Sequence, residues 1–148
     1  MALITYLAED NQTILENLVE TLEEITEVRV VAHAATQAEA TRWLELQDGK
    51  WHLAIVDLFL KEGSGLGVLN GCRNREPSQK VVVLTNYATA EIRRRACDLG
   101  ADAVFDKSTE LDALYAYCRQ QTENISREDV QEAQREAIAQ HQVPAIPV

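Results

Sequence analysis

The chain has 148 residues, 46% of them hydrophobic and 26% charged, which suits one folded domain and argues against intrinsic disorder. Its formal net charge of −10 argues against a nucleic-acid-binding surface, which needs a basic face. No apolar run approaches the roughly 18 residues of a membrane-spanning helix, so we expect no membrane segment.

Two strand–helix pairs account for the first third of the chain. Leu3 to Ala8 is predicted to be a strand, and apolar residues three and four apart then predict a helix over residues 14–25. A second strand is expected from Glu27 to Ala32, where polar and apolar residues alternate as they do at a sheet edge. Thr36 and Glu39 form a capping box that opens the second helix.

The two most apolar runs are predicted to be central strands. Leu53–Val56 and Val81–Leu84 contain no polar residue, and strands that are buried on both faces have this composition. Between them we expect a flexible loop at Gly63–Gly67 and a short helix that stops before Pro77. The glycine-rich segment is not a dinucleotide-binding motif, because Val68 stands where that motif needs glycine or alanine.

A helix, a strand and a last helix complete the predicted domain. The helix is expected to follow the cap residue Thr89 and end at Leu99, and the strand to cover Ala103 to Phe105. The last helix follows Ser108. Five such pairs predict an α/β fold with a parallel sheet, doubly wound because connections are right-handed and helices must cover both faces. We assign residues 1–120 to this domain.

Residues 121–148 form a polar C-terminal extension that we expect to be partly helical with a loose end. Ser126 and the acids after it could open a sixth helix. Its thin apolar stripe would consist of Val130, Ala133, Ala137 and Ile138. This stretch could extend the fifth helix, pack on the domain or mediate dimerisation. Residues 143–148 contain two prolines and are not expected to be helical.

Polar residues stand at the ends of four predicted strands. Glu9 and Asp10 follow the first strand, Asp57 the third, Thr85 the fourth and Lys107 comes after the fifth. In open parallel sheets, ligands bind outside the carboxyl ends of the strands at a topological switch point. The sequence therefore predicts that these residues form one site.

The residue types at this site suit phosphoryl transfer. Three neighbouring carboxylates repel one another unless a cation lies among them, and their hard oxygen atoms suit Mg²⁺. Lys107 adds a fixed positive charge, and an aspartate such as Asp57 can accept a phosphoryl group as a nucleophile. The hydroxyl of Thr85 could then donate a hydrogen bond to a phosphoryl oxygen.

Four segments in this order resemble the motifs of the response-regulator receiver family. They are Leu7–Asn11, Ile55–Leu58 with Gly63–Leu66, Val83–Asn86 and Gly100–Ser108. The resemblance covers roughly residues 2–120. It implies a flavodoxin-like three-layer sandwich whose five-stranded parallel sheet has the strand order 2-1-3-4-5.

The resemblance also implies a role for each site residue. Mg²⁺ would be bound by Glu9 (through water), Asp10, Asp57 and the backbone carbonyl of Phe59. A sensor histidine kinase or phosphotransfer protein would phosphorylate Asp57, and Thr85 and Lys107 would read the phosphoryl group. Such a protein is not an enzyme, because it assists only its own phosphorylation and dephosphorylation.

We expect a phosphorylation-activated switch that changes partner binding through the face of the fourth helix, fifth strand and fifth helix, with a homodimer possible. The 28 residues after Gln120 are too few and too acidic for a DNA-binding output domain. The alternative is a non-phosphorylated pseudo-receiver that acts as a protein-interaction module. An Asp-nucleophile phosphatase ranks last, since Phe59 stands where its second acid would be.

Several positions depart from the family pattern. Val104 stands where the family usually has an aromatic switch residue, and Phe105 should face the opposite side of the sheet. Asn86 follows the threonine in place of a small residue, and Ser108 replaces a frequent proline. These departures make the usual switching movement uncertain and favour a helix cap after Lys107.

Other side chains near the predicted site are open to interpretation. Phe59 and Tyr87 are large rings that could exclude the attacking water, so we hypothesise slow self-dephosphorylation. The run Arg93–Arg95 on the fourth helix could bind a partner, although a solvated helical face is the simpler interpretation.

The start of the chain and its cysteines favour a cytoplasmic location. The first ten residues lack the basic segment of a signal peptide. The three cysteines, Cys72, Cys97 and Cys118, have no metal-type spacing and suit reduced thiols.

Overall fold

The computed structural model of the chain describes residues 2–142, except for the side chains at 128–130, 132–133, 136 and 139–142. The predicted loose end, residues 143–148, lies outside the described residues. Strands and helices alternate along the chain: β1 Leu3–Ala8, α1 Gln12–Ile25, β2 Val28–Ala34, α2 Gln37–Leu46, β3 Leu53–Val56, α3 Gly65–Gly71, β4 Lys80–Thr85, α4 Ala90–Asp98, β5 Ala103–Asp106 and α5 Leu111–Gln142.

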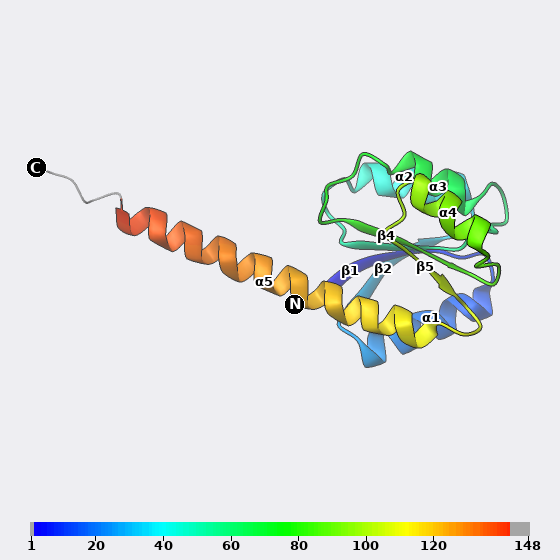
Figure 1. Cartoon of the computed structure of the whole chain (residues 1–148), viewed down its shortest axis with the longest axis horizontal. Coiled ribbons are helices and arrows are strands. Elements are labelled where there is room, and N and C mark those ends of the chain that lie inside the picture. The colour runs from blue at the N-terminus through cyan, green and yellow to red at the C-terminus, as the bar shows by residue number, and fades with distance from the viewer. Residues whose placement is uncertain (1, 143–148) are drawn as a thin grey trace, which may run out of the picture.

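The strands form one parallel sheet in the order β2-β1-β3-β4-β5, which confirms the predicted fold class and strand order. Figure 1 shows α2, α3 and α4 over one face of this sheet and α1 and α5 over the other, so the domain has three layers. β2 lies at an edge, as its alternating sequence predicts. Within the described chain, no helix is both long and apolar enough to cross a membrane.

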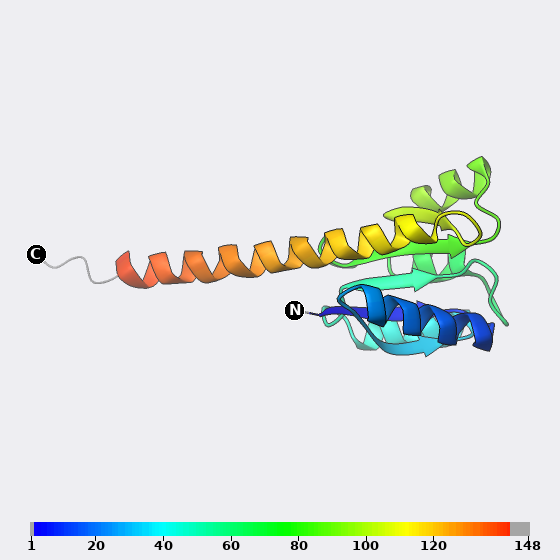
Figure 2. The same cartoon turned by 90° about the horizontal axis from the view of Figure 1, so that it is seen from below.

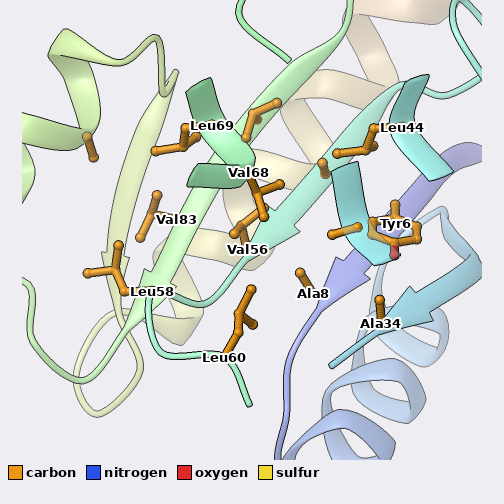
Figure 3. Close-up of a cluster of buried hydrophobic side chains, with 14 of the residues drawn as sticks. Tyr6, Ala8, Ala34, Leu44, Val56, Leu58, Leu60, Val68, Leu69 and Val83 are labelled. Atoms are coloured by element: carbon orange, nitrogen blue, oxygen red, sulfur yellow. The ribbon is translucent and has the colours of Figure 1, made fainter. Parts of the chain in front are cut away.

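Successive residues of the inner strands pack into two separate hydrophobic cores. Val56 and Val83 lie in the core beneath α2, α3 and α4, together with the labelled residues of Figure 3. Their neighbours Ile55 and Leu84 lie in the core on the side of α1 and α5. Alternation across a strand produces this division, and it explains why the two inner strands are continuously apolar.

Side-chain caps fix where the helices begin. The oxygens of Thr36 and Thr89 accept hydrogen bonds from backbone N–H groups at the starts of α2 and α4, which confirms both predicted caps. Asn11 caps α1 by accepting from the N–H of Ile14 at 3.0 Å, so this helix begins earlier than the apolar spacing suggested. The early start leaves only a tight turn between β1 and α1.

The predicted flexible loop at Gly63–Gly67 is wrong in its second half, because α3 begins at Gly65 and is capped by Ser64. A Cβ atom at Gly65 would lie 2.2 Å from the backbone oxygen of Asp57. Glycine is therefore needed here so that the helix can pack closely on the end of β3, rather than for a flexible loop.

The extension continues α5 instead of forming a separate sixth helix. α5 runs without a break from Leu111 to Gln142, and the chain contains neither glycine nor proline between these residues. Ser126 thus lies inside the helix and does not cap a new one. In Figures 1 and 2 the second half of α5 projects away from the sheet. Of the predicted stripe, the side chains of Val130 and Ala133 lie outside the described residues.

Candidate functional site

The candidate site lies at the carboxyl ends of four adjacent strands. Backbone pairing continues from the sheet into the site residues: the N–H of Asp57 donates to Ala8 at 2.9 Å, and the N–H of Lys107 donates to Thr85 at 2.9 Å. Because β1, β3, β4 and β5 are neighbours, residues from both halves of the sequence meet at one edge.

Lys107 joins two buried acids. Its Nζ atom donates to both carboxylate oxygens of Glu9 at 3.0 Å and to Oδ2 of Asp57 at 2.8 Å. The side chains of all three residues are at most 11% exposed. Burying a single charge in this way would be costly, so the ammonium and carboxylate groups depend on one another.

A third acid lies beside this buried group. Glu9, Asp10 and Asp57 each offer a carboxylate oxygen within 4.8 Å of the others, and Asp10 is exposed. Three carboxylates and one ammonium leave an excess of negative charge among hard oxygen donors. Such a donor set fits a divalent cation such as Mg²⁺.

The electrostatic surroundings change the pKa of two of these groups. Burial is the main cause that raises the pKa of Glu9 to about 7; Asp57 adds to this effect and Lys107 opposes it. For Lys107, burial alone would lower the pKa, but the contacts with Asp57 and Glu9 outweigh burial and raise it. Lys107 therefore keeps its positive charge at neutral pH, and the acids beside it would gain from a further cation.

Thr85 is fully buried at the end of β4. Its Oγ1 accepts a hydrogen bond from the N–H of Tyr87 at 3.1 Å, which shapes the turn towards α4. Beside it, the hydroxyl of Ser108 donates to Oδ1 of Asn86 at 3.3 Å and so links the segments that follow β4 and β5.

Phe59 and Tyr87 form an exposed aromatic pair. Their rings meet edge to face with centroids 5.0 Å apart, and the two residues are 57% and 59% exposed. The backbone N–H of Phe59 donates to Oδ1 of Asp57 at 3.3 Å, so the pair is tied to the central acid. The sequence predicted both residues near the site but gave no sign that their rings touch.

Arg93 is partly exposed, but its guanidinium also binds groups within the fold, so a solvated helical face does not fully describe this residue of the run. Its guanidinium donates to the carbonyls of Ala88 at 3.1 Å and Val104 at 3.0 Å, and to a carboxylate oxygen of Glu110 at 2.5 Å. Arg93 also lowers the pKa of Glu110. Sequence patterns miss this bridge because its partners, on β5 and just before α5, are 11 and 17 residues away. Arg94 is exposed, as the simpler interpretation expects.

Val104 and Phe105 face opposite sides of the sheet, as predicted. Val104 packs in the core beneath α4, whereas Phe105 packs in the other core, edge to face with Tyr117 at 5.7 Å between ring centroids. An aliphatic side chain thus occupies the β5 position beneath α4.

Comparison with known proteins places these features in a family context. The profile of the response regulator receiver domain matches residues 5–119. The photosynthetic apparatus regulatory protein RegA of Cereibacter sphaeroides is 29% identical over 104 residues, which cover 70% of this chain and 54% of RegA. The acid tolerance regulatory protein ActR of Rhizobium meliloti is 35% identical over 63 residues, 43% of this chain and 32% of ActR. The chain thus spans about half, or less, of the length of the curated relatives it matches.

Solved structures share the fold. The signal receiver domain of a putative Luxo repressor protein from Vibrio parahaemolyticus has a TM-score of 0.71 at 23% identity, covering 89% of this chain and 98% of that one. The isolated REC domain of RcsB from Salmonella enterica serovar Typhimurium, determined with the phosphomimetic BeF3-, has a TM-score of 0.62 at 23% identity, with 73% and 79% covered.

Proposed function

Since this chain belongs to the response regulator receiver domain family, we propose that it is a phosphorylation-activated switch of a two-component phosphorelay. Asp57 is the proposed phosphoacceptor, and a sensor histidine kinase or phosphotransfer protein is the proposed donor. The observation that carries this proposal is the buried contact of Lys107 with Asp57 at 2.8 Å. A lysine held at the sheet edge beside a nucleophilic carboxylate suits the transfer of an anionic phosphoryl group.

In the proposed reaction, a carboxylate oxygen of Asp57 attacks phosphorus while the bond from phosphorus to the donor's imidazole nitrogen breaks. The nitrogen keeps the electron pair of that bond, and an acyl phosphate remains on Asp57. Lys107 would hold the charge of the transferred oxygens, and the hydroxyl of Thr85 would donate to one of them. These roles describe self-modification by the chain and not turnover of a substrate.

The acids suit a metal ion in this reaction. Asp10 and Asp57 would bind Mg²⁺ directly, Glu9 would bind it through water, and the carbonyl of Phe59 would complete the site. When bound, the ion supplies positive charge to the carboxylates and the phosphoryl oxygens.

The proposed output is a change in partner binding at the face of α4, β5 and α5. A phosphoryl group adds about −1.5 to −2 charges at neutral pH, and Thr85 and Lys107 would move towards it. That movement would shift an existing conformational equilibrium at this face, in a monomer or a homodimer. RegA and ActR carry the description of regulatory proteins, which supports a signalling role, and we expect it to be exercised in the cytoplasm.

The proposal is tested by incubating the chain with acetyl phosphate and Mg²⁺ and measuring intact mass. We expect one phosphoryl group on the wild type and none on Asp57→Asn, and the same pair should differ in its spectral response to beryllofluoride with Mg²⁺. A wild-type chain that neither gains mass nor responds would instead support the pseudo-receiver, a module that binds partners without phosphorylation.

A further inference from the structure

The segment between β3 and α3 is attached to the start of α2. The N–H of Lys61 donates to the carbonyl of Ala35 at 2.9 Å, and the N–H of Gln37 donates to the carbonyl of Glu62 at 3.0 Å. Thr36 and Glu62 pair as in a parallel sheet. The segment after Asp57 is therefore hydrogen-bonded to the turn that follows β2.

The side chain of Gln37 fills the space left by two glycines in this segment. A Cβ atom at Gly63 would lie 2.5 Å from the Cβ of Gln37, and one at Gly67 would lie 2.3 Å from its amide group. Between these glycines, Oε1 of Gln37 accepts a hydrogen bond from the backbone N–H of Ser64 at 2.9 Å. Gly63 also has a φ of +81°, which favours glycine.

Ser64 in turn connects to the residues that surround Asp57. It pairs with Phe59 in an antiparallel bridge, and the N–H of the next residue, Gly65, donates to the carbonyl of Leu58 at 2.9 Å. The order of the segment that carries the Phe59 carbonyl therefore depends on contacts that end at Gln37, which itself makes no described contact with Asp57.

We propose that Gln37 is a positioning residue, which holds the segment after β3 so that the Phe59 carbonyl lies at the metal site. This role rests on the proposed function, because it requires that Mg²⁺ binds beside Asp57. Loss of the Gln37 acceptor lets the segment move, so that only part of the population has its metal ligands in place. The apparent affinity for Mg²⁺ then falls to that fraction of its intrinsic value.

Two substitutions distinguish the effect of losing the hydrogen bond from the effect of changing the side-chain volume. Gln37→Met has a similar length but no acceptor for the N–H of Ser64, whereas Gln37→Glu keeps an acceptor oxygen at the same position. Gln120→Met, at an exposed position of α5, is the matched control. Binding of Mg²⁺ is followed by NMR titration of the backbone amides, and the exchange rate of the Ser64 amide hydrogen reports the bond itself.

We expect Gln37→Met to weaken Mg²⁺ binding roughly two- to tenfold, the range of one hydrogen bond, and to speed exchange at Ser64. The other two variants should resemble the wild type. With acetyl phosphate, Gln37→Met should need more Mg²⁺ but reach nearly the wild-type maximal rate, since Gln37 does not touch the reacting atoms.

The outcomes distinguish this inference from the proposed function. A wild type that takes up phosphate on Asp57 with Mg²⁺, together with a Gln37→Met variant of equal Mg²⁺ affinity, overturns the role of Gln37 alone. A Gln37→Glu variant as weak as Gln37→Met also overturns it, because its acceptor is present. A wild type that binds no Mg²⁺ overturns both.

Discussion

Glu9 carries an unusual charge state because its carboxyl group is buried between another acid and a lysine. In the metal-free protein its pKa is raised to about 7, mainly by burial, whereas an unfolded chain has the ordinary value near 4.5. The folded state thus holds an additional proton between these two values. The contribution of this raised pKa to the free energy of unfolding is fully present below pH 4.5. It is lost as the pH rises towards 7.

The first prediction is a difference in the pH dependence of stability. In EDTA, the free energy of unfolding measured with urea should fall more between pH 5 and about 7.5 for the wild type than for Glu9→Gln. The variant has no such proton to lose. Addition of Mg²⁺ should reduce this loss, because the ion stabilises the ionised carboxylates. Parallel stability curves for the two proteins in EDTA would contradict the assignment of this pKa.

We hypothesise that the aromatic pair hinders the approach of water to an acyl phosphate on Asp57, because the backbone of Phe59 contacts this residue. The rings of Phe59 and Tyr87 support one another edge to face, although more than half of each residue is exposed. Removal of either ring would therefore take away a neighbour of the other.

The second prediction is that Phe59→Ala and Tyr87→Ala each speed loss of the phosphoryl group several-fold, by admitting the attacking water. Tyr87→Phe keeps the ring and should remain slow. The decay is measured from intact mass after acetyl phosphate is removed. Rapid decay in the wild type that neither alanine variant changes would show that the rings do not exclude water.

At the scale of elements, α4 is attached to its neighbours by apolar contacts and by the bonds of Arg93. Ala96 is the one described residue of α4 that is fully buried, and Ile92 packs against the same core while partly exposed. The guanidinium of Arg93 adds bonds to a carbonyl of β5 and to the carboxylate of Glu110, which directly precedes α5. A movement of α4 must break or rearrange these bonds.

The third prediction concerns this attachment. Arg93→Ala should lower the free energy of unfolding by about 1–2 kcal/mol, since the ion pair is partly exposed and the carbonyl bonds contribute most. Hydrogen exchange should rise in α4. Arg94→Ala removes an exposed neighbour and should change stability by less than about 0.5 kcal/mol. Equal effects of the two substitutions in urea unfolding would argue against the bridge.

At the scale of the whole molecule, α5 has two parts with different surroundings. Leu114 and Cys118 are buried in the core, and Ile125 still packs against it. The second half of the helix projects away from the sheet, as Figure 2 shows. Contacts of α5 with the core therefore continue as far as Ile125.

The fourth prediction uses two truncations. A chain that ends after Arg127 should have a free energy of unfolding within about 0.5 kcal/mol of that of the full chain. One that ends after Gln121 loses Thr122 and Ile125 and should be less stable by about 1–2 kcal/mol. Light scattering on both tests dimerisation: an unchanged number of chains per particle after the Gln121 truncation would exclude the projecting helix as a dimer contact.

The amino-acid sequence was sufficient to predict the sheet and the proximity of Asp57 and Lys107. Leu53–Val56 is apolar throughout, and its burial on both faces follows from that composition alone. Asp57 and Lys107 could be placed together because the ends of adjacent parallel strands converge whatever the exact packing. The caps Thr36 and Thr89 act within one helical turn and were equally predictable.

Only the tertiary structure decided which side chains meet across the chain. Gln37 and Ser64 are 27 residues apart, and Arg93 and Glu110 are 17 apart, so no local pattern links them. The glycines before and within α3 suggested flexibility, whereas the structure packs them closely, and a helix without glycine or proline continued past Ser126. Strand ends are fixed by composition and periodicity, which the sequence contains. The contacts that position the segment after Asp57 depend on packing between distant elements, which only the folded chain brings together.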